Sequence, residues 1–182
     1  MRKAIHYILL SLCILLVACS NDSKTELTVV DAQKAYNDAI GTYKGYVIDN
    51  NIPATVYMTL GQEFSIRNLP VTPLLRRFFS GKELDDAIAS VKEKVFKAPT
   101  VSMSITGDLV YITMEPTDWT FTATVNNEKY DVSVLMSATV LYSHTYDNLS
   151  ANIVVNELYC NGQKADLSSN SISWLIDEAT KQ

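Results

Sequence analysis

Alternation of apolar and polar residues runs along most of the chain and predicts a domain built mainly from β-strands. Every second residue is apolar in segments such as Ala54–Leu60 and Tyr130–Val140, which is the period of a half-buried strand. Turn residues such as Asn126-Asn127 separate these segments. We predict about eight antiparallel strands, within residues 42–48, 54–60, 64–69, 100–106, 109–114, 119–125, 130–140 and 152–160.

Helical spacing of apolar residues is confined to three places. It predicts a short N-terminal helix at about 29–40, a helical insertion at about 73–95 and a short C-terminal helix at about 171–180. Pro99 is expected to end the insertion. The predicted fold class is therefore α+β: a mostly antiparallel β-sheet, arranged as a sandwich or an open curled barrel, with these helices added.

Residues 1–18 have the pattern of a targeting segment. Arg2 and Lys3 precede an almost purely apolar run from Ile5 to Val17. Roughly 13 residues suit the apolar region of a signal peptide, whereas a spanning helix needs about 20. We therefore interpret residues 1–18 as a signal peptide, 19–27 as a tether and 28–182 as one β-rich globular domain.

The end of that segment, Leu16-Val17-Ala18-Cys19, resembles the lipobox of bacterial lipoproteins. In such proteins cleavage occurs before the cysteine, whose sulfur receives a diacylglyceryl group and which carries fatty acyl chains such as palmitate. The resemblance implies lipid attachment at Cys19 and membrane lipid as a partner. Ser20 follows in place of the Asp that favours retention at the inner membrane, so we expect an outer-membrane address, facing the periplasm or the cell surface.

Charge and cysteine content narrow the function classes further. The net charge is −5, and removal of Arg2 and Lys3 makes it more negative. No Lys/Arg stripe is present, which disfavours nucleic-acid binding. Of the three cysteines, Cys13 leaves with the signal peptide and Cys19 takes the lipid, so Cys160 has no intramolecular disulfide partner.

The sequence shows no catalytic, cofactor or metal constellation. His144 is the one histidine after cleavage and lies near Asp147, but a Ser/His/Asp site needs a strained nucleophile turn, and no G-x-S-x-G is present. Cys160 lies in an alternating strand without a close basic neighbour, as a buried structural cysteine would. We predict no catalytic residue, no cofactor and no metal.

Other acidic, amide and aromatic groups have simpler explanations than a site. Asp85-Asp86 and Asp177-Glu178 are adjacent in sequence, so on helices their side chains would diverge and remain solvated. Asp49-Asn50-Asn51 and Asn126-Asn127 lack the spacing of a calcium loop, and turn chemistry accounts for both. The ten tyrosines and two tryptophans fit core packing, or alternatively a platform for a glycan or peptide.

The order of several soft motifs resembles a domain-of-unknown-function family of lipoproteins from gut anaerobic bacteria. After the lipobox these are Gly41-Thr42-Tyr43-Lys44-Gly45, Ser65-Ile66-Arg67-Asn68-Leu69-Pro70-Val71, a helix bearing Leu84 and Ala87, and Asn127-Glu128-Lys129-Tyr130-Asp131-Val132. The resemblance covers most of residues 28–165. It implies an envelope address and a single domain, and it transfers no site.

The resulting hypothesis is a lipid-anchored cell-envelope protein that binds a protein or glycan partner without catalysis. The alternatives are an envelope hydrolase with an unrecognised site and a structural subunit of a surface assembly. A cluster of polar groups around His144 in a concave pocket would favour the hydrolase. An exposed aromatic patch would favour the binding module.

Overall fold

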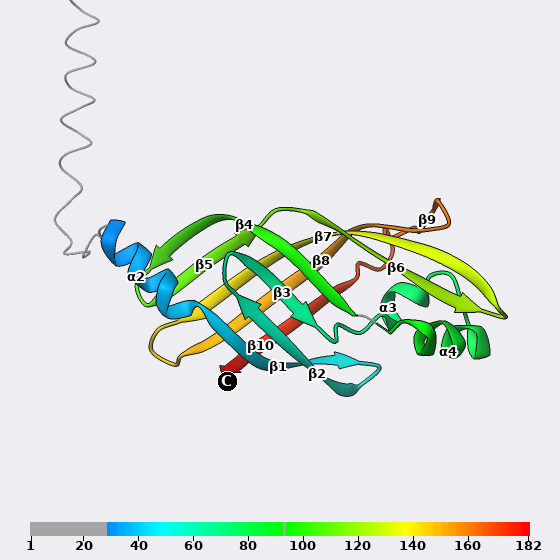
Figure 1. Cartoon of the computed structure of the whole chain (residues 1–182), viewed down its shortest axis with the longest axis horizontal. Helices are drawn as coiled ribbons and strands as arrows, with labels where there is room; N and C mark the ends of the chain where they lie inside the picture. Colours follow the sequence, from blue (N-terminus) through cyan, green and yellow to red (C-terminus); the bar gives the residue numbers. More distant parts are fainter. Residues whose placement is uncertain (1–28, 93) are drawn as a thin grey trace, which may run out of the picture.

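A closed antiparallel barrel forms the body of the protein in the computed structural model, which describes residues 29–182 except residue 93 (Figure 1). In order around the wall, its eight strands are β1 (Gly41–Asp49), β2 (Ile52–Leu60), β3 (Glu63–Arg67), β4 (Val95–Thr106), β5 (Leu109–Met114), β7 (Glu128–Ser143), β8 (Asn148–Cys160) and β10 (Ser173–Lys181). Pairing of β10 with β1 closes the ring. Strands β6 (Thr117–Val125) and β9 (Gln163–Lys164) are additional partners of β7 and β8.

The prediction of a β-rich chain is confirmed, but the α+β class with an open sandwich or open barrel is wrong. Strands make up more than half of the described residues, and the wall is closed. In the described part of the chain the helices are three and short: α2 (Val29–Ala39), α3 (Thr72–Leu75) and α4 (Gly81–Ser90). Apolar periodicity indicates which face of a strand is buried but not which strands pair. It therefore could not predict that the strands close into a ring.

The predicted C-terminal helix is wrong because a β-bulge disguises a strand. In β10 the buried residues are Trp174, Ile176 and Ala179. The register with β8 shifts between Ile176 and Ala179, so one apolar spacing of three replaces a spacing of two. That spacing, together with the apolar but exposed Leu175, imitates helical periodicity.

The predicted helical insertion at 73–95 is replaced by two shorter helices and extended chain. Helix α3 has four residues and α4 has ten. Val91 already has an extended backbone, although its side chain is buried. Pro99 lies inside β4 rather than after a helix. Its carbonyl accepts a bond from Glu115 N–H, so its nitrogen faces away from β3 and no ladder bond to β3 is lost.

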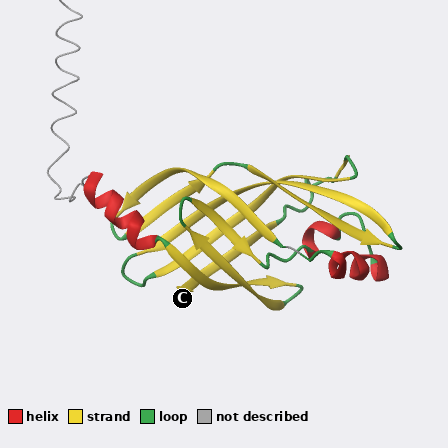
Figure 2. Ribbon diagram, in the orientation of Figure 1, coloured by secondary structure: helices red, strands yellow, loops and turns green. Residues whose placement is uncertain are grey.

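The helices lie at opposite ends of the barrel, α2 at one end and α3 with α4 at the other (Figure 2). Ala35 and Ala39 of α2 are buried. The Tyr36 hydroxyl donates to the carbonyl of Gly61, and the Tyr43 hydroxyl of β1 donates to the carbonyl of Ala39 at 2.7 Å. These contacts attach α2 to the first strands, whereas α4 packs against β6.

Large apolar side chains occupy the space between the strands. Tyr43, Phe64 and Phe96 are all fully buried. An eight-stranded barrel is just wide enough to be filled by side chains or to hold one small ligand. Burial of each large side chain contributes about 1.5–3 kcal/mol. The inside of the barrel therefore serves as the core of the fold, and a functional site is better sought on the wall and at the ends.

Candidate functional site: a split in the barrel wall

Strand β7 is unusually long and carries two strands in succession along one edge. Residues 128–136 of β7 pair with β6, and residues 139–143 pair with β5. Strand β5 continues the ring to β4, but β6 pairs only with β7 in the described residues. Strands β4 and β6 therefore lie close together near Pro99 and Glu115 and diverge towards α4 (Figure 1). The divergence leaves a split in the wall.

The main chain of β6 faces this split at every second residue. In an antiparallel pair, residues that bond to the partner strand alternate with residues whose N–H and C=O point away. The N–H of Thr124 donates to the Ser90 hydroxyl of the segment ending α4, at 2.7 Å, so Thr124 points away from β7. By the same alternation the main-chain groups of Thr120 and Thr122 also point away from β7. Neither residue has a main-chain partner on that side among residues 29–182, residue 93 excepted.

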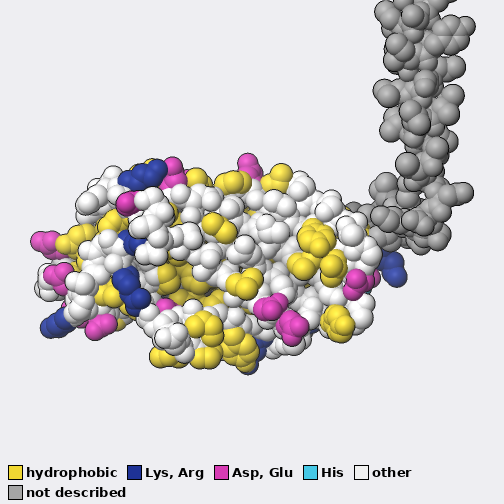
Figure 3. Space-filling view, turned by 180° about the vertical axis from the view of Figure 1, so that it is seen from behind, with side chains coloured by type: hydrophobic (Ala, Val, Ile, Leu, Met, Phe, Trp, Pro, Cys, Tyr) yellow, Lys and Arg dark blue, Asp and Glu magenta, His cyan; other side chains and the backbone are white. Residues whose placement is uncertain are grey.

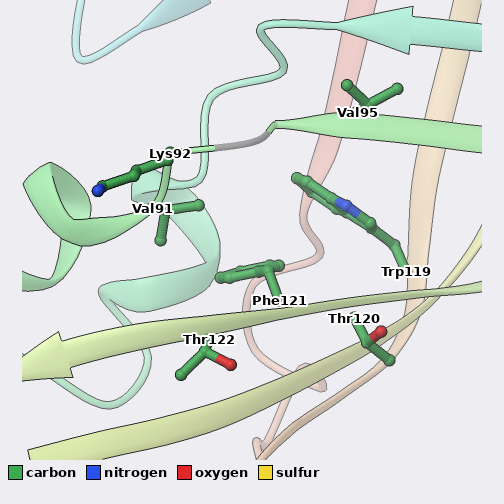
Figure 4. Close-up of a pocket in the computed structure, with 7 residues that line it drawn as sticks. All are labelled: Val91, Lys92, Val95, Trp119, Thr120, Phe121 and Thr122. Atoms are coloured by element: carbon green, nitrogen blue, oxygen red, sulfur yellow. The ribbon is translucent and has the colours of Figure 1, made fainter.

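Aromatic side chains form the floor of a cleft in the split, whose volume is about 350 Å³. The rings of Trp119 and Phe121 extend from β6 towards Val95 and Val91 (Figure 4). Their centroids are 5.0 Å apart. Trp119 is only 6% exposed, while Phe121 is partly exposed. Because the Trp119 ring is nearly enclosed, Phe121 is the more accessible of the two rings in the cleft.

The mouth of the cleft is polar and carries one positive charge among the described lining residues. Thr120 and Thr122 lie on the β6 side, and the exposed Lys92 lies on the opposite side. A site with an apolar floor, a few polar groups and a volume above about 300 Å³ has the properties of a binding pocket. Lys92, Thr120 and Thr122, its described polar lining residues, include no base positioned beside a nucleophile.

A second, shallower depression of about 710 Å³ lies against the first, over β6, β7 and the β8–β9 turn. The two share Thr120, Phe121 and Thr122. Thr122 Oγ1 donates to Asp131 Oδ1 at 3.1 Å. Tyr159 also lines this depression, and its hydroxyl donates to Glu157 Oε2 at 2.8 Å. The two depressions therefore adjoin along β6.

The groups around His144 do not form a catalytic triad. The Ser143 hydroxyl donates to Asp108 Oδ2 at 3.2 Å, and His144 Nδ1 lies 4.0 Å from Asp38 Oδ2. Asp147, the acid that the sequence places near His144, accepts the Tyr142 hydroxyl instead, at 2.9 Å. A nucleophile must lie within hydrogen-bond reach of its base. Ser143 and His144 are instead each directed to a different carboxylate.

Ionisation in this cluster fits structural hydrogen bonding. Burial raises the pKa of Tyr142 to about 12, and the hydrogen bond to Asp147 acts in the same direction. Burial also raises the pKa of Tyr43, whose ring meets Tyr142 edge-on at 6.4 Å. The hydrogen bond from Thr145 holds the pKa of Asp108 below its ordinary value. Neutral Tyr142 and Tyr43 can donate their hydroxyl protons, and ionised Asp108 can accept hydrogen bonds. These forms hold the β7–β8 turn to the β4–β5 turn and β1 to α2.

The remaining candidates of the sequence analysis lie apart from one another. Cys160 is buried, and burial followed by the charge of Asp131 raises the pKa of its thiol, which reduces its thiolate fraction. Asp177 accepts the Ser150 hydroxyl at 2.9 Å. Asn126 and Asn127 have positive φ angles in the β6–β7 turn. No group of three metal-ligating side chains occurs in the described ranges. Cys19 lies outside the described residues.

Sequence reasoning missed the split, although one signal for it was present. Two shorter predicted strands, 109–114 and 119–125, precede the long alternating run Tyr130–Val140. A strand of such length can pair with both shorter strands along one of its edges. Its other edge then pairs with β8. The sequence places Trp119 and Phe121 in an alternating strand. Periodicity alone does not distinguish an aromatic residue in the core from one in a cleft, because both lie on the buried face of a strand.

On the face of Figure 3, which is seen from behind, apolar side chains occur in several separate groups and Lys and Arg side chains are few. Exposed apolar residues include Tyr46, Ile48 and Ile52 on β1 and β2. Exposed apolar residues are ordinary on protein surfaces unless they form a large patch. Of the helices within residues 29–182, none combines the length and apolar character needed to cross a bilayer.

Comparison with known proteins gives one match. No curated protein and no solved structure matches the chain. A family described as Domain of unknown function (DUF4840) matches residues 38–160, which run from the end of α2 to the last residue of β8. The match includes β6 and most of the wall on both sides of the split. The chain therefore belongs to the DUF4840 family.

Proposed function

We propose that this protein is a lipid-anchored binding protein of the bacterial cell envelope. The proposal of an anchor rests on the order of a positive start, an apolar run and the Leu16–Cys19 lipobox. The acylated Cys19 would join membrane lipid, and Ser20 supports an outer-membrane address, with the domain facing the periplasm or the surface. Membership in DUF4840 is compatible with an origin in gut anaerobic bacteria, which belongs to the same proposal.

The observation that carries the binding function is the cleft between β4 and β6. It combines the aromatic floor of Trp119 and Phe121 with main-chain groups of Thr120 and Thr122 that have no main-chain partner among the described residues. Buried aromatic anchors beside unsatisfied hydrogen-bonding groups are what a partner needs to gain affinity. The partner is a protein or a glycan. The hydrolase alternative draws no support from His144, because its nearest acid lies 4.0 Å away and Ser143 bonds to Asp108.

Metabolic labelling with an alkyne-bearing fatty acid tests the anchor. In cells that produce the full chain, wild-type protein should incorporate the label and fractionate with the outer membrane. Cys19→Ala should lose the label, because the thiolate is the group that accepts the lipid. Labelling of Cys19→Ala at the wild-type level would contradict lipid attachment at this residue.

Binding is tested with the purified full chain against glycan and peptide arrays, and against ester, peptide and glycoside substrates. Phe121→Ala removes a ring from the cleft. Tyr146→Ala removes a 74% exposed ring from the β7–β8 turn and is the matched control. We expect binding that Phe121→Ala weakens at least tenfold and Tyr146→Ala leaves unchanged. Turnover lost in His144→Ala would overturn the proposal, and absence of all binding would favour a structural subunit.

A further inference from the structure

We propose that the split between β4 and β6 takes an extended peptide of a partner protein, which pairs with β6 as an added strand. This inference rests on the proposed binding function and names the class of partner. Addition of a strand to an exposed edge supplies main-chain hydrogen bonds for affinity, and side-chain pockets supply specificity. Three features of the split favour such an occupant over a glycan or a second folded copy.

The first feature is the spacing of the unpaired main-chain groups. Thr120 and Thr122 present N–H and C=O to the split and are two residues apart, so their groups recur with the repeat of an extended peptide, about 6.6–6.8 Å. Thr124 would continue the series, but Ser90 already occupies its N–H at 2.7 Å. An added strand therefore pairs with the part of β6 before Thr124 and ends where α4 begins to cover the edge.

The second feature is the alternation of side chains along the same stretch. Trp119 and Phe121 direct their rings to the floor of the cleft, whereas Thr120 and Thr122 lie at its mouth (Figure 4). Residues directly opposite each other in neighbouring strands point to the same face. In an added strand, residues opposite Trp119 and Phe121 would contact the apolar floor, and the residues between them would face solvent. The preferred peptide alternates apolar and polar residues.

The third feature is what lies on the other side of the split. The nitrogen and carbonyl of Val95 in β4 face the split, because the carbonyl of Lys94 accepts the N–H of Asn68, the residue after β3, at 2.8 Å and successive residues alternate. Val95 also lines the cleft. A strand bound to β6 thus has β4 as its second neighbour. A strand at the edge of another folded sheet is already paired on its other side, so it could not also have β4 as a neighbour. A flexible segment therefore fits the split better than the edge strand of a second barrel.

The charge at the mouth adds a preference within peptides. Lys92 is exposed and is the charged residue among the described lining residues. Its side chain can pair with a carboxylate of an incoming segment and increase the rate of encounter. We expect peptides with a Glu or Asp next to their apolar positions to bind more tightly than the same peptides with Lys.

Selection from a phage-displayed library of random nine-residue peptides tests the inference, with the full chain in detergent as bait. Selected sequences should alternate apolar and polar residues and contain Glu or Asp. Labelled synthetic versions are then titrated by fluorescence anisotropy, and Lys92→Glu should weaken their binding. Selection of no peptide, or of peptides without alternation, would overturn the inference.

Paired variants of β6 separate main-chain recognition from side-chain recognition. Thr122→Pro removes the N–H that faces the split without removing a bond to β7, and Thr122→Val removes only the hydroxyl. We expect Pro to weaken peptide binding about fivefold to tenfold, as the loss of one main-chain bond implies, and Val to change it less than twofold. Thermal melts check that both variants fold, and Thr120→Pro with Thr120→Val is the second pair.

The reverse result identifies the other class of partner. If glycans bind, peptides do not, and Thr122→Val abolishes glycan binding while Phe121→Ala weakens it, the peptide inference fails and the proposed binding function stands. If neither peptides nor glycans bind the full chain, both proposals fail together. Equal effects of Pro and Val on peptide binding would also overturn strand addition, because recognition would then depend on the side chain.

Discussion

Gly45 tests the closure of the barrel, because its place in β1 leaves room for the bulge of β10. A Cβ atom at Gly45 would lie 2.5 Å from Ile176 Cγ2 and 2.9 Å from Ala179 Cβ. Both neighbours are buried, and they flank the register shift of β10. The Ile176 methyl can rotate away, but Ala179 has no flexible side chain, so the strands themselves must separate. Gly45→Ala should therefore strain the seam where the ring closes.

The expected loss of stability follows from two opposing effects. Overpacking a tight core costs typically about 1–3 kcal/mol, while replacement of Gly by Ala stabilises by about 0.4–1 kcal/mol through the unfolded state. The net expectation is a loss of roughly 1–2 kcal/mol for Gly45→Ala. Gly61→Ala is the matched control, because its Cβ would meet nothing nearer than the carbonyl oxygen of Glu63 at 4.0 Å. Gly61→Ala should be neutral or slightly stabilising.

Equilibrium unfolding in urea measures both variants, with the fluorescence of the buried Trp119 and Trp174 as signal. The account predicts a lower midpoint for Gly45→Ala, an unchanged or higher midpoint for Gly61→Ala, and the same slope for both. Equal midpoints would refute the close approach of β10 to β1. A helix over residues 171–180, as the sequence pattern suggested, would give Gly45 no reason to differ from Gly61.

Three further predictions concern the cleft, the thiol and the tyrosine cluster. Ser90→Ala removes the acceptor of the Thr124 N–H. It should destabilise the protein by about 1 kcal/mol and speed hydrogen exchange of the Thr124 amide. The control Ser104→Ala, at an exposed position of β4, should have neither effect. Cys160 should react slowly with a thiol reagent in the folded protein and rapidly in urea, because it is buried and its pKa is raised; equal rates would show an exposed thiol. The raised pKa of Tyr142 means that the unfolded chain loses its proton first, so stability should be constant below about pH 10 and fall as the pH approaches 12; urea midpoints across this range should fall less in Tyr142→Phe.

The sequence predicted strands better than their connections. Segments such as 54–60 and 109–114 have the alternation that β2 and β5 show, because burial of one strand face is a local property. Closure of the ring depends on β10 meeting β1, a contact between distant residues that leaves no local period. Where a bulge at Asp177 and Glu178 breaks the alternation, the local pattern pointed to the wrong element.

The same limit explains why the cleft could not be predicted. Trp119 and Phe121 have the spacing of any half-buried strand, and their place in a cleft follows because none of the described strands pairs with the second edge of β6. By contrast, the interpretation of Cys160 as a buried thiol is confirmed, because burial in an alternating strand is what periodicity reports. The anchor at Cys19 remains a prediction from its own motif.

Hydrogen exchange along β6, followed by NMR on the full-length protein, tests the split wall most directly. Amides bonded to β7, at Trp119, Phe121 and Ala123, should exchange slowly, and so should Thr124 through Ser90. The Thr120 and Thr122 amides should exchange at least tenfold faster in the free protein, and a bound peptide should slow them. Uniformly slow exchange from Trp119 to Thr124 in the free protein would show that the edge of β6 is already paired, and would contradict the account.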